Sequence, residues 1–187
     1  MNLSKPLERE VEIGGATYEV NLAFDNVLNL LDILQSPYVS AGEKVMQGIY
    51  LLLGTTLDIK AEHQVKVFQT LLEKFVREGE DKEQHVDLAG NPMPAEQTAP
   101  TYDLSHDANY IYTSFMQAYN INLFKEQGKL DWREFKALLQ DLPDETKFKK
   151  VIDIRTRPYP KGKGTSEERQ QLKTLKQAFA LPNEVID

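Results

Sequence analysis

The stretch from Asp107 to Pro160 constrains the fold of this chain most strongly. Apolar residues recur in it at helical spacing in three successive runs, and short connectors join the runs. The stretch also contains the single tryptophan, Trp132, and many of the aromatic residues. Amphipathic helices joined by short connectors bury their apolar faces against one another. We therefore predict that this stretch forms the packed centre of a helical domain.

A β-hairpin is predicted at the N-terminus. Apolar residues alternate with polar ones on both sides of Gly14 and Gly15. A tight two-residue turn needs positive φ at both of its positions, which glycine adopts readily. Two strands alone are marginally stable in water. We expect the hairpin either to pack on its own domain or to be completed by another chain.

Helical spacing continues after the hairpin. It predicts a helix that starts at Phe24 and ends before Pro37, a second that Gly54 ends, and a third from about Ala61 to Arg77. The second helix is apolar on nearly all sides, so we expect it to be the most buried. Three capping boxes are predicted from paired residues at helix starts: Ser40 with Glu43, Asp131 with Glu134, and Thr165 with Glu168. Asp144 or Thr146 is expected to cap another helix.

Four segments are distinguished along the chain. Residues 1–22 form the hairpin, residues 23–78 a first helical part, and residues 104–187 the helical core with a C-terminal helix. Between them, residues 79–103 show no periodicity and contain several prolines, which indicates a flexible loop or linker. The predicted fold is mainly α, about seven helices with a small N-terminal β-hairpin, in one domain overall; a two-domain linker is the alternative.

Composition and charge narrow the class of protein. The chain of 187 residues has no cysteine, which excludes a disulfide framework. It has no apolar run long enough to span a bilayer and no apolar signal core, so we expect a cytosolic protein. The net charge is −7, but Lys147–Lys176 carries ten cations and three anions, or +7. Such a basic segment can bind nucleic acid or an acidic protein surface; the negative total disfavours nucleic acid.

Candidate catalytic and metal-binding residues are few. The histidines lie on three different segments without a second ligand at metal-site spacing: His63, His85 and His106. Asp141, Asp144 and Glu145 cluster, but they lie at helix ends, where carboxylates cap helices and interact with the helix dipole. No nucleophile motif or dinucleotide fingerprint is present. We therefore expect no metal, no cofactor and no enzymatic activity.

The order of residues in the central stretch resembles a known family. The pattern is Tyr110-Ile111-Tyr112-x-Ser114-Phe115-x-Gln117-x-Tyr119, then Gln127-Gly128-Lys129-Leu130-x-Trp132-x-x-Phe135-x-Ala137-Leu138-Leu139, then Thr146-Lys147-Phe148 and Ile154-Arg155-Thr156. It is similar to the bacteriophage gene-product-fifteen family, encoded in the tail-morphogenesis region of phages and prophages of Gram-positive bacteria. The resemblance is close over Asp107–Leu181. It departs at Asn120 and Asp141, where the family has glycine, at Asp131 (histidine) and at Arg133 (a second tryptophan).

The N-terminal hairpin adds a second likeness. Its Ile-Gly-Gly-x-Thr-Tyr order over Ile13–Tyr18, running into a helix that starts at Phe24, is similar to the opening of several phage tail assembly chaperones. The resemblance implies a chaperone-like assembly factor in the host cytoplasm. Its implied partners are the tape-measure protein, the tail-tube protein or a neighbouring tail assembly protein, with a homo-oligomer also possible. A minor structural component of the virion tail and a nucleic-acid-binding factor are the alternatives.

A partner-binding surface, called the working surface below, is predicted where the last core helix ends before Pro158 and Pro160. Prolines prevent helix continuation there, so the segment should be exposed and partly extended. It carries cationic groups around one aromatic ring, a combination enriched at binding surfaces: Arg155, Arg157, Tyr159, Lys161 and Lys163. We expect this segment, with the C-terminal helix, to contact an acidic stretch of the tape measure or a sister subunit. A solvated linker is the alternative.

Overall fold

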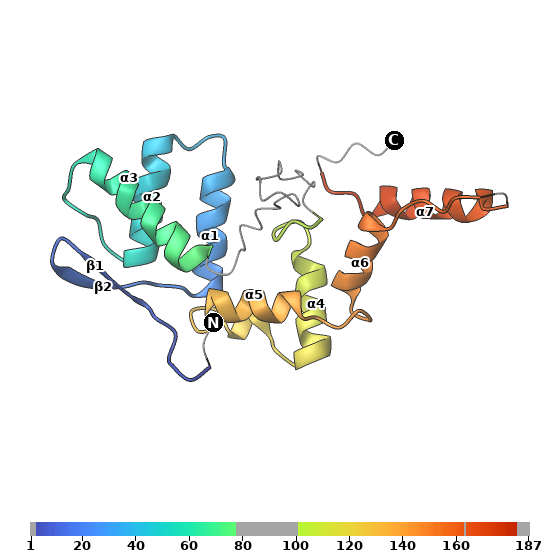
Figure 1. Cartoon of the computed structure of the whole chain (residues 1–187), viewed down its shortest axis with the longest axis horizontal. Coiled ribbons are helices and arrows are strands. Elements are labelled where there is room, and N and C mark those ends of the chain that lie inside the picture. The colour runs from blue at the N-terminus through green and yellow to red at the C-terminus, as the bar shows by residue number, and fades with distance from the viewer. Residues whose placement is uncertain (1–2, 78–100, 163, 183–187) are drawn as a thin grey trace, which may run out of the picture. The chain divides into compact units, whose positions relative to one another are not determined.

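The computed structural model describes residues 3–77, 101–162 and 164–182. The described residues form seven α-helices and one two-stranded hairpin (Figure 1), which confirms the predicted mainly α fold. The elements are β1 (Glu10–Ile13), β2 (Ala16–Glu19), α1 (Phe24–Gln35), α2 (Ala41–Leu53), α3 (Ala61–Leu71), a π-helical turn η1 (Leu72–Val76), α4 (Ala108–Tyr119), a 3-10 turn η2 (Leu123–Lys125), α5 (Trp132–Gln140), α6 (Lys147–Thr156) and α7 (Ser166–Ala178). Of the predicted linker, residues 79–100 lie outside the described residues.

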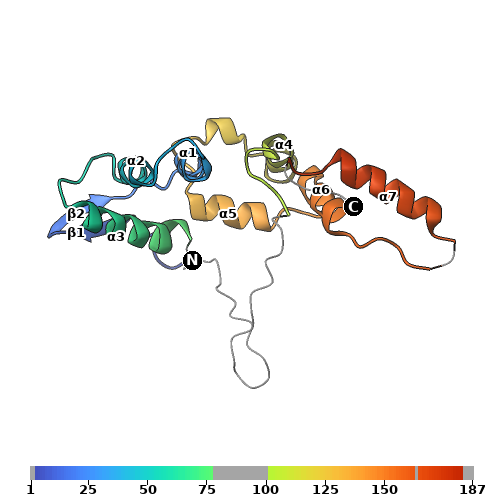
Figure 2. The same cartoon turned by 90° about the horizontal axis from the view of Figure 1, so that it is seen from above.

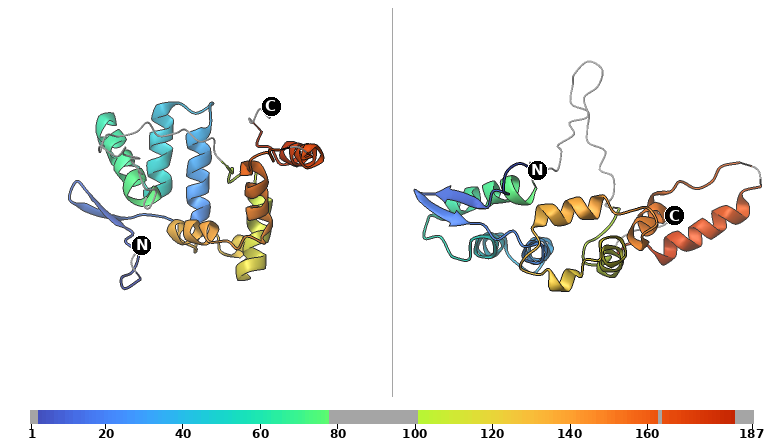
Figure 3. Two further views of the ribbon diagram at one scale, coloured as in Figure 1. Left: turned by 45° about the vertical axis from the view of Figure 1, so that its right-hand side comes forward. Right: turned by 90° about the horizontal axis from the view of Figure 1, so that it is seen from below.

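The hairpin is paired as its sequence predicts. Strands β1 and β2 are antiparallel, with Val11 opposite Tyr18 and Glu10 opposite Glu19. Gly14 and Gly15 have φ of 60° and 82°, the positive values that a primed two-residue turn requires. The hairpin can be followed in both views of Figure 3. Its base joins the helices through the backbone, since the Asn21 amide donates to Leu52 O at 2.7 Å.

The chain divides into two compact units. The first comprises Met1–Glu83 with Phe124–Leu138, and the second comprises Gln84–Leu123 with Leu139–Asp187. In the first unit α1 packs on α2 and α2 on α3 (Figures 1 and 2). The segment before α5 joins this unit by a short backbone bridge: Phe24 N donates to Leu130 O at 2.9 Å, and Trp132 N donates to Leu22 O at 2.7 Å.

Aromatic rings fill the centre of the first unit. The ring of Phe135 stacks on Phe24 at 5.0 Å and on Trp132 at 5.6 Å between centroids. The Trp132 indole is 4% exposed, and its Nε1 donates to Val76 O at 2.9 Å. Trp132 and Phe135 are therefore buried, as expected for a packed central stretch. Helix α2 lies close to α3 at Gly48, where an added Cβ would meet the ring of Phe68.

The second unit is built on α4, α6 and α7. Helix α4 packs on α6, and the Ser114 hydroxyl in α4 accepts a hydrogen bond from Phe148 N at the start of α6, at 3.1 Å. Phe115 and Phe148 are buried in this unit, whereas Trp132 and Phe135 belong to the first. Asn120 ends α4 in the left-handed conformation with φ 55° and ψ 30°. Asparagine tolerates this region better than most residues, which explains how it stands where the family pattern has glycine.

The prediction that α2 is the most buried helix was wrong. Only Gly48, Ile49 and Leu52 of this helix are buried, whereas Met46 and Tyr50 are 52% and 56% exposed. Residues 48, 49 and 52 share one face of the helix, while residues 46 and 50 lie one turn apart on another face. Helices α1 and α3 cover only the first of these faces in the described structure.

The predicted helix caps have mixed outcomes. Ser40 and Glu43 form the complete reciprocal capping box. Asp131 forms half of one: its amide donates to Glu134 Oε2 at 3.2 Å, and its carboxylate caps the helix by accepting from the amide of Arg133, at 3.0 Å, rather than from that of Glu134. Thr165 and Thr146 occupy N-cap positions without capping through their side chains. Their hydroxyls donate instead to the carbonyls of residues 162 and 143, so those two predicted caps were wrong.

Candidate functional site

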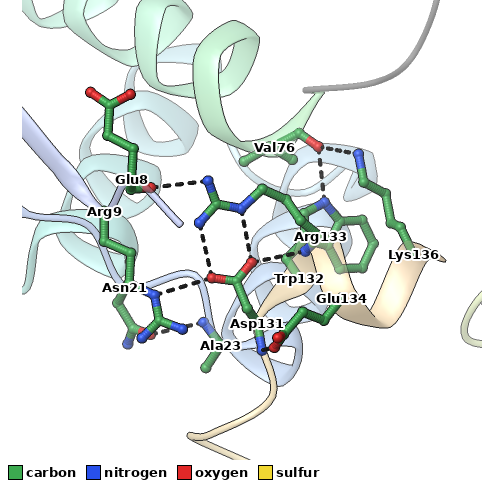
Figure 4. A network of polar contacts seen from close by, with 10 residues as sticks. All are labelled: Glu8, Arg9, Asn21, Ala23, Val76, Asp131, Trp132, Arg133, Glu134 and Lys136. Atoms are coloured by element: carbon green, nitrogen blue, oxygen red, sulfur yellow. Dashed lines mark hydrogen bonds and ion pairs between the residues drawn. The ribbon is translucent and has the colours of Figure 1, made fainter. Parts of the chain in front are cut away.

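A network of charged groups lies at the base of the hairpin in the first unit (Figure 4). The Arg133 guanidinium donates from Nε to Asp131 Oδ1 at 2.9 Å and from Nη2 to Oδ2 at 3.0 Å. Its Nη1 reaches Glu8 O at 2.9 Å, and Arg9 Nε lies 3.2 Å from Asp131 Oδ2. The network therefore joins the segment just before β1 to the start of α5.

The Asp131 carboxylate stays ionised within this network. Burial by itself would raise the pKa of Asp131, but the hydrogen bonds from Arg133 and the charges of Arg133 and Arg9 outweigh it and lower the pKa below its ordinary value. Asp131 and Arg133 are two of the positions at which the sequence departs from the family pattern. The two side chains bind each other directly, so the charge of each is neutralised by the other.

A second buried ion pair lies in the second unit. Arg155 Nη1 and Nη2 donate to the two carboxylate oxygens of Asp107 at 2.6 and 2.8 Å, and Arg155 Nε donates to Phe179 O at 2.6 Å. Arg155 is only 7% exposed. The prediction that Arg155 belongs to an exposed working surface was therefore wrong: its guanidinium binds α4 and the end of α7 from within the core.

The rest of the predicted working surface is placed differently. Arg157 and Lys161 are exposed, and Arg157 forms an ion pair with Asp153 one turn earlier in α6. Tyr159 is half-buried, with Arg169 5.7 Å and Lys176 5.0 Å from its ring centroid. Lys163 lies outside the described residues. Whether these groups bind a partner stays a prediction.

The extended chain after α6 runs beside α7 (Figure 2), and its Tyr159 lies against Arg169 and Lys176 of that helix. On α7, residues 169, 173 and 176 are spaced i, i+4 and i+7 and share a face. We name as the basic corner the cationic groups of this face of α7 and of the chain beside it: Arg157, Lys161, Arg169, Lys173 and Lys176. A hollow of about 420 Å³ opens here, lined by Pro158, Tyr159, Pro160, Lys161, Gly162, Thr165 and Arg169.

The exposed side of α2 forms an apolar groove in the first unit. The groove has a volume of about 320 Å³ and is lined by Ile33, Met46, Gln47, Tyr50, Leu51 and Thr56. Tyr38, in the turn between α1 and α2, is 95% exposed. Sequence reasoning missed this groove because the apolar residues of α2 were all assigned to the core. The signal was present, since Met46 and Tyr50 form a second i, i+4 pair beside the buried face.

The buried polar groups of the described residues have structural partners. Every buried side-chain nitrogen or oxygen among them makes a hydrogen bond, and no three potential ligands gather there as a metal site would need. His63 and His106 are exposed, as are Asp141, Asp144 and Glu145; His85 lies outside the described residues. In the part of the chain that the structure describes, no helix has the length and apolar character to cross a membrane.

These features define a mainly helical protein: in the described residues the buried charged groups bind one another, and the surface includes an apolar groove and a basic corner. The comparison with protein families adds its identity. A model described as bacteriophage Gp15 protein matches residues 3–181, and the chain belongs to this family. The match extends over both units, beyond the central stretch in which the resemblance was first seen. No match was found among curated proteins or among solved structures.

Proposed function

We propose that this phage protein is a non-catalytic tail assembly factor, a chaperone that binds the tape-measure protein in the host cytoplasm before the tail tube forms. Membership of the Gp15 family supports a phage role. The observation that carries the proposal is the apolar groove on α2. The tail-tube protein or a neighbouring tail assembly protein is the alternative occupant of that groove.

The groove suits an amphipathic helix. An unassembled tape measure, as a long helical protein, exposes apolar stripes that need cover, and a helix lays such a stripe into an apolar groove. Met46 and Tyr50 are both more than half exposed at the groove. Methionine adapts its shape to different apolar partners, and tyrosine supplies a large rigid contact. Such a groove can therefore cover many successive stretches of one partner.

The test is binding to the tape-measure protein of the same phage. The double variant Met46→Lys/Tyr50→Lys removes the apolar contact and leaves the buried face of α2 intact. Because these side chains are already about half-buried, burying the rest of each contributes about 0.8–1.5 kcal/mol, so we expect binding to weaken at least about tenfold. Val65→Lys is the matched control, because Val65 is an apolar residue of α3 that is 41% exposed and lies outside the groove. Equal binding by the double variant and this control would contradict the proposal.

Two further measurements separate the alternatives. Mass spectrometry of purified virions should lack this protein; its retention would favour a minor structural component of the tail. DNA binding that depends on salt, and that is lost when the charges of the basic corner are reversed, would favour a nucleic-acid-binding factor. For the non-catalytic part of the proposal, reproducible hydrolysis that disappears when Asp141, Asp144 and Glu145 are replaced together would show an enzyme instead.

A further inference from the structure

The hairpin has one acidic face. Because side chains alternate along a strand, the paired register puts Val11, Tyr18 and Ile13 on one face. The other face carries Glu10, Glu12, Thr17 and Glu19, all exposed. The strands contact each other extensively and the described helices little. Three carboxylates therefore stand on a face that the described helices leave open.

Two of these carboxylates are held close together. Val20 N donates to Arg9 O at 2.6 Å, so the next pair, Glu10 opposite Glu19, is of the non-hydrogen-bonded kind. In such pairs the Cα atoms are about 4.5 Å apart and the side chains are closest, and like charges there destabilise the hairpin. Among the described residues, none of the three glutamates forms an ion pair. A cationic partner would relieve this repulsion.

The basic corner offers matching charges at matching distances. Glu10 and Glu12, two residues apart on a strand, are separated by about 7 Å. Arg169 and Lys173, four residues apart on α7, are separated by about 6 Å along the helix. Two ion pairs can therefore form side by side. The half-buried ring of Tyr159 and the adjoining hollow add an apolar surface and a depression to the charged groups of this site.

We propose that the acidic hairpin face of one copy docks on the basic corner of a second copy. Both surfaces belong to the same chain, so every copy that offers one also offers the other. The two surfaces differ, and such a head-to-tail contact leaves a free hairpin at one end and a free corner at the other. Contacts of this kind extend into rings or open filaments. The proposal requires no tape measure and does not depend on the apolar groove.

The test is the self-association of the full chain, measured by sedimentation velocity at increasing concentration and at low and high salt. One variant reverses the hairpin charges (Glu10→Lys, Glu12→Lys, Glu19→Lys). The other reverses the corner (Lys161→Glu, Arg169→Glu, Lys173→Glu). Each alone should weaken association at least about tenfold, a loss of about 1.4 kcal/mol. High salt should weaken the wild-type contact as well, because it screens exposed charges.

Mixing the two variants gives the sharpest result. Each variant keeps one intact surface, and the two reversed surfaces also carry opposite charges, so the mixture should associate again where each variant alone does not. A matched control reverses three other exposed acids of the first unit and should associate like the wild type: Asp58→Lys, Glu62→Lys and Glu73→Lys. If the hairpin variant fails to fold by circular dichroism, Glu10→Gln/Glu12→Gln/Glu19→Gln removes the charge without reversing it.

Several outcomes would overturn the proposal. A wild-type chain that stays monomeric at low salt would do so, as would variants that remain separate when mixed. A corner variant that loses tape-measure binding but still self-associates would show that the basic corner binds the tape measure and not a second copy. The groove variant Met46→Lys/Tyr50→Lys should self-associate normally, so a failure of the proposed function can be told apart from a failure of this contact.

Discussion

Replacing Gly48 by alanine tests the packing of α2 on α3. In an open helix interior alanine is favoured over glycine by about 0.8–1 kcal/mol. At this position, however, an added Cβ would lie 2.6 Å from Phe68 Cζ and 3.1 Å from Leu30 Cδ1. Carbon atoms normally stay about 3.5–4.0 Å apart, so the buried Phe68 ring would have to move. Such overpacking costs about 1–3 kcal/mol.

The balance favours glycine. We expect Gly48→Ala to lower the free energy of unfolding by up to about 2 kcal/mol, measured by urea denaturation followed by circular dichroism. Gly42→Ala is the control, because Gly42 lies in the same helix and a Cβ there meets no atom within 4 Å. That variant should be neutral or slightly stabilised. If the two variants are equally stable, α2 does not pack on Phe68 as described.

Four further substitutions test the packing of Trp132 and the two buried ion pairs. Trp132→Ala should lower the free energy of unfolding by about 3–5 kcal/mol, and a thermal melt like that of the parent would contradict the burial of the indole. Arg155→Glu should unfold the second unit or lower its stability by about 3–5 kcal/mol, because it leaves the Asp107 carboxylate buried beside a like charge. Arg157→Glu, on the exposed side of the same helix, should leave the melting temperature nearly unchanged; equal losses in both variants would refute this distinction. Asp131 has a pKa below its ordinary value in the folded chain, so its stabilising effect is complete above about pH 4 and is lost as the pH falls toward the folded pKa. The stability difference between the wild type and Asp131→Asn should therefore shrink below about pH 4, and a difference that is independent of pH would count against the ion pair with arginine.

Local features of this chain could be predicted from the sequence alone. The turn at Gly14 and Gly15 and the capping box at Ser40 depend on groups within a few residues of one another. Helical periodicity likewise located α1 and α3 and the burial of Trp132. Each of these features is set by backbone preference or by the repeat of apolar residues, which the sequence displays directly.

The tertiary structure decided which side of each element is covered. Arg155 was assigned to the surface because it precedes two prolines, yet its partner Asp107 lies 48 residues earlier in the chain. Met46 was assigned to the core because it is apolar, yet neighbouring helices cover only one face of α2. Burial depends on which segments meet in space, and a single sequence records the apolar character of a residue without recording what packs against it.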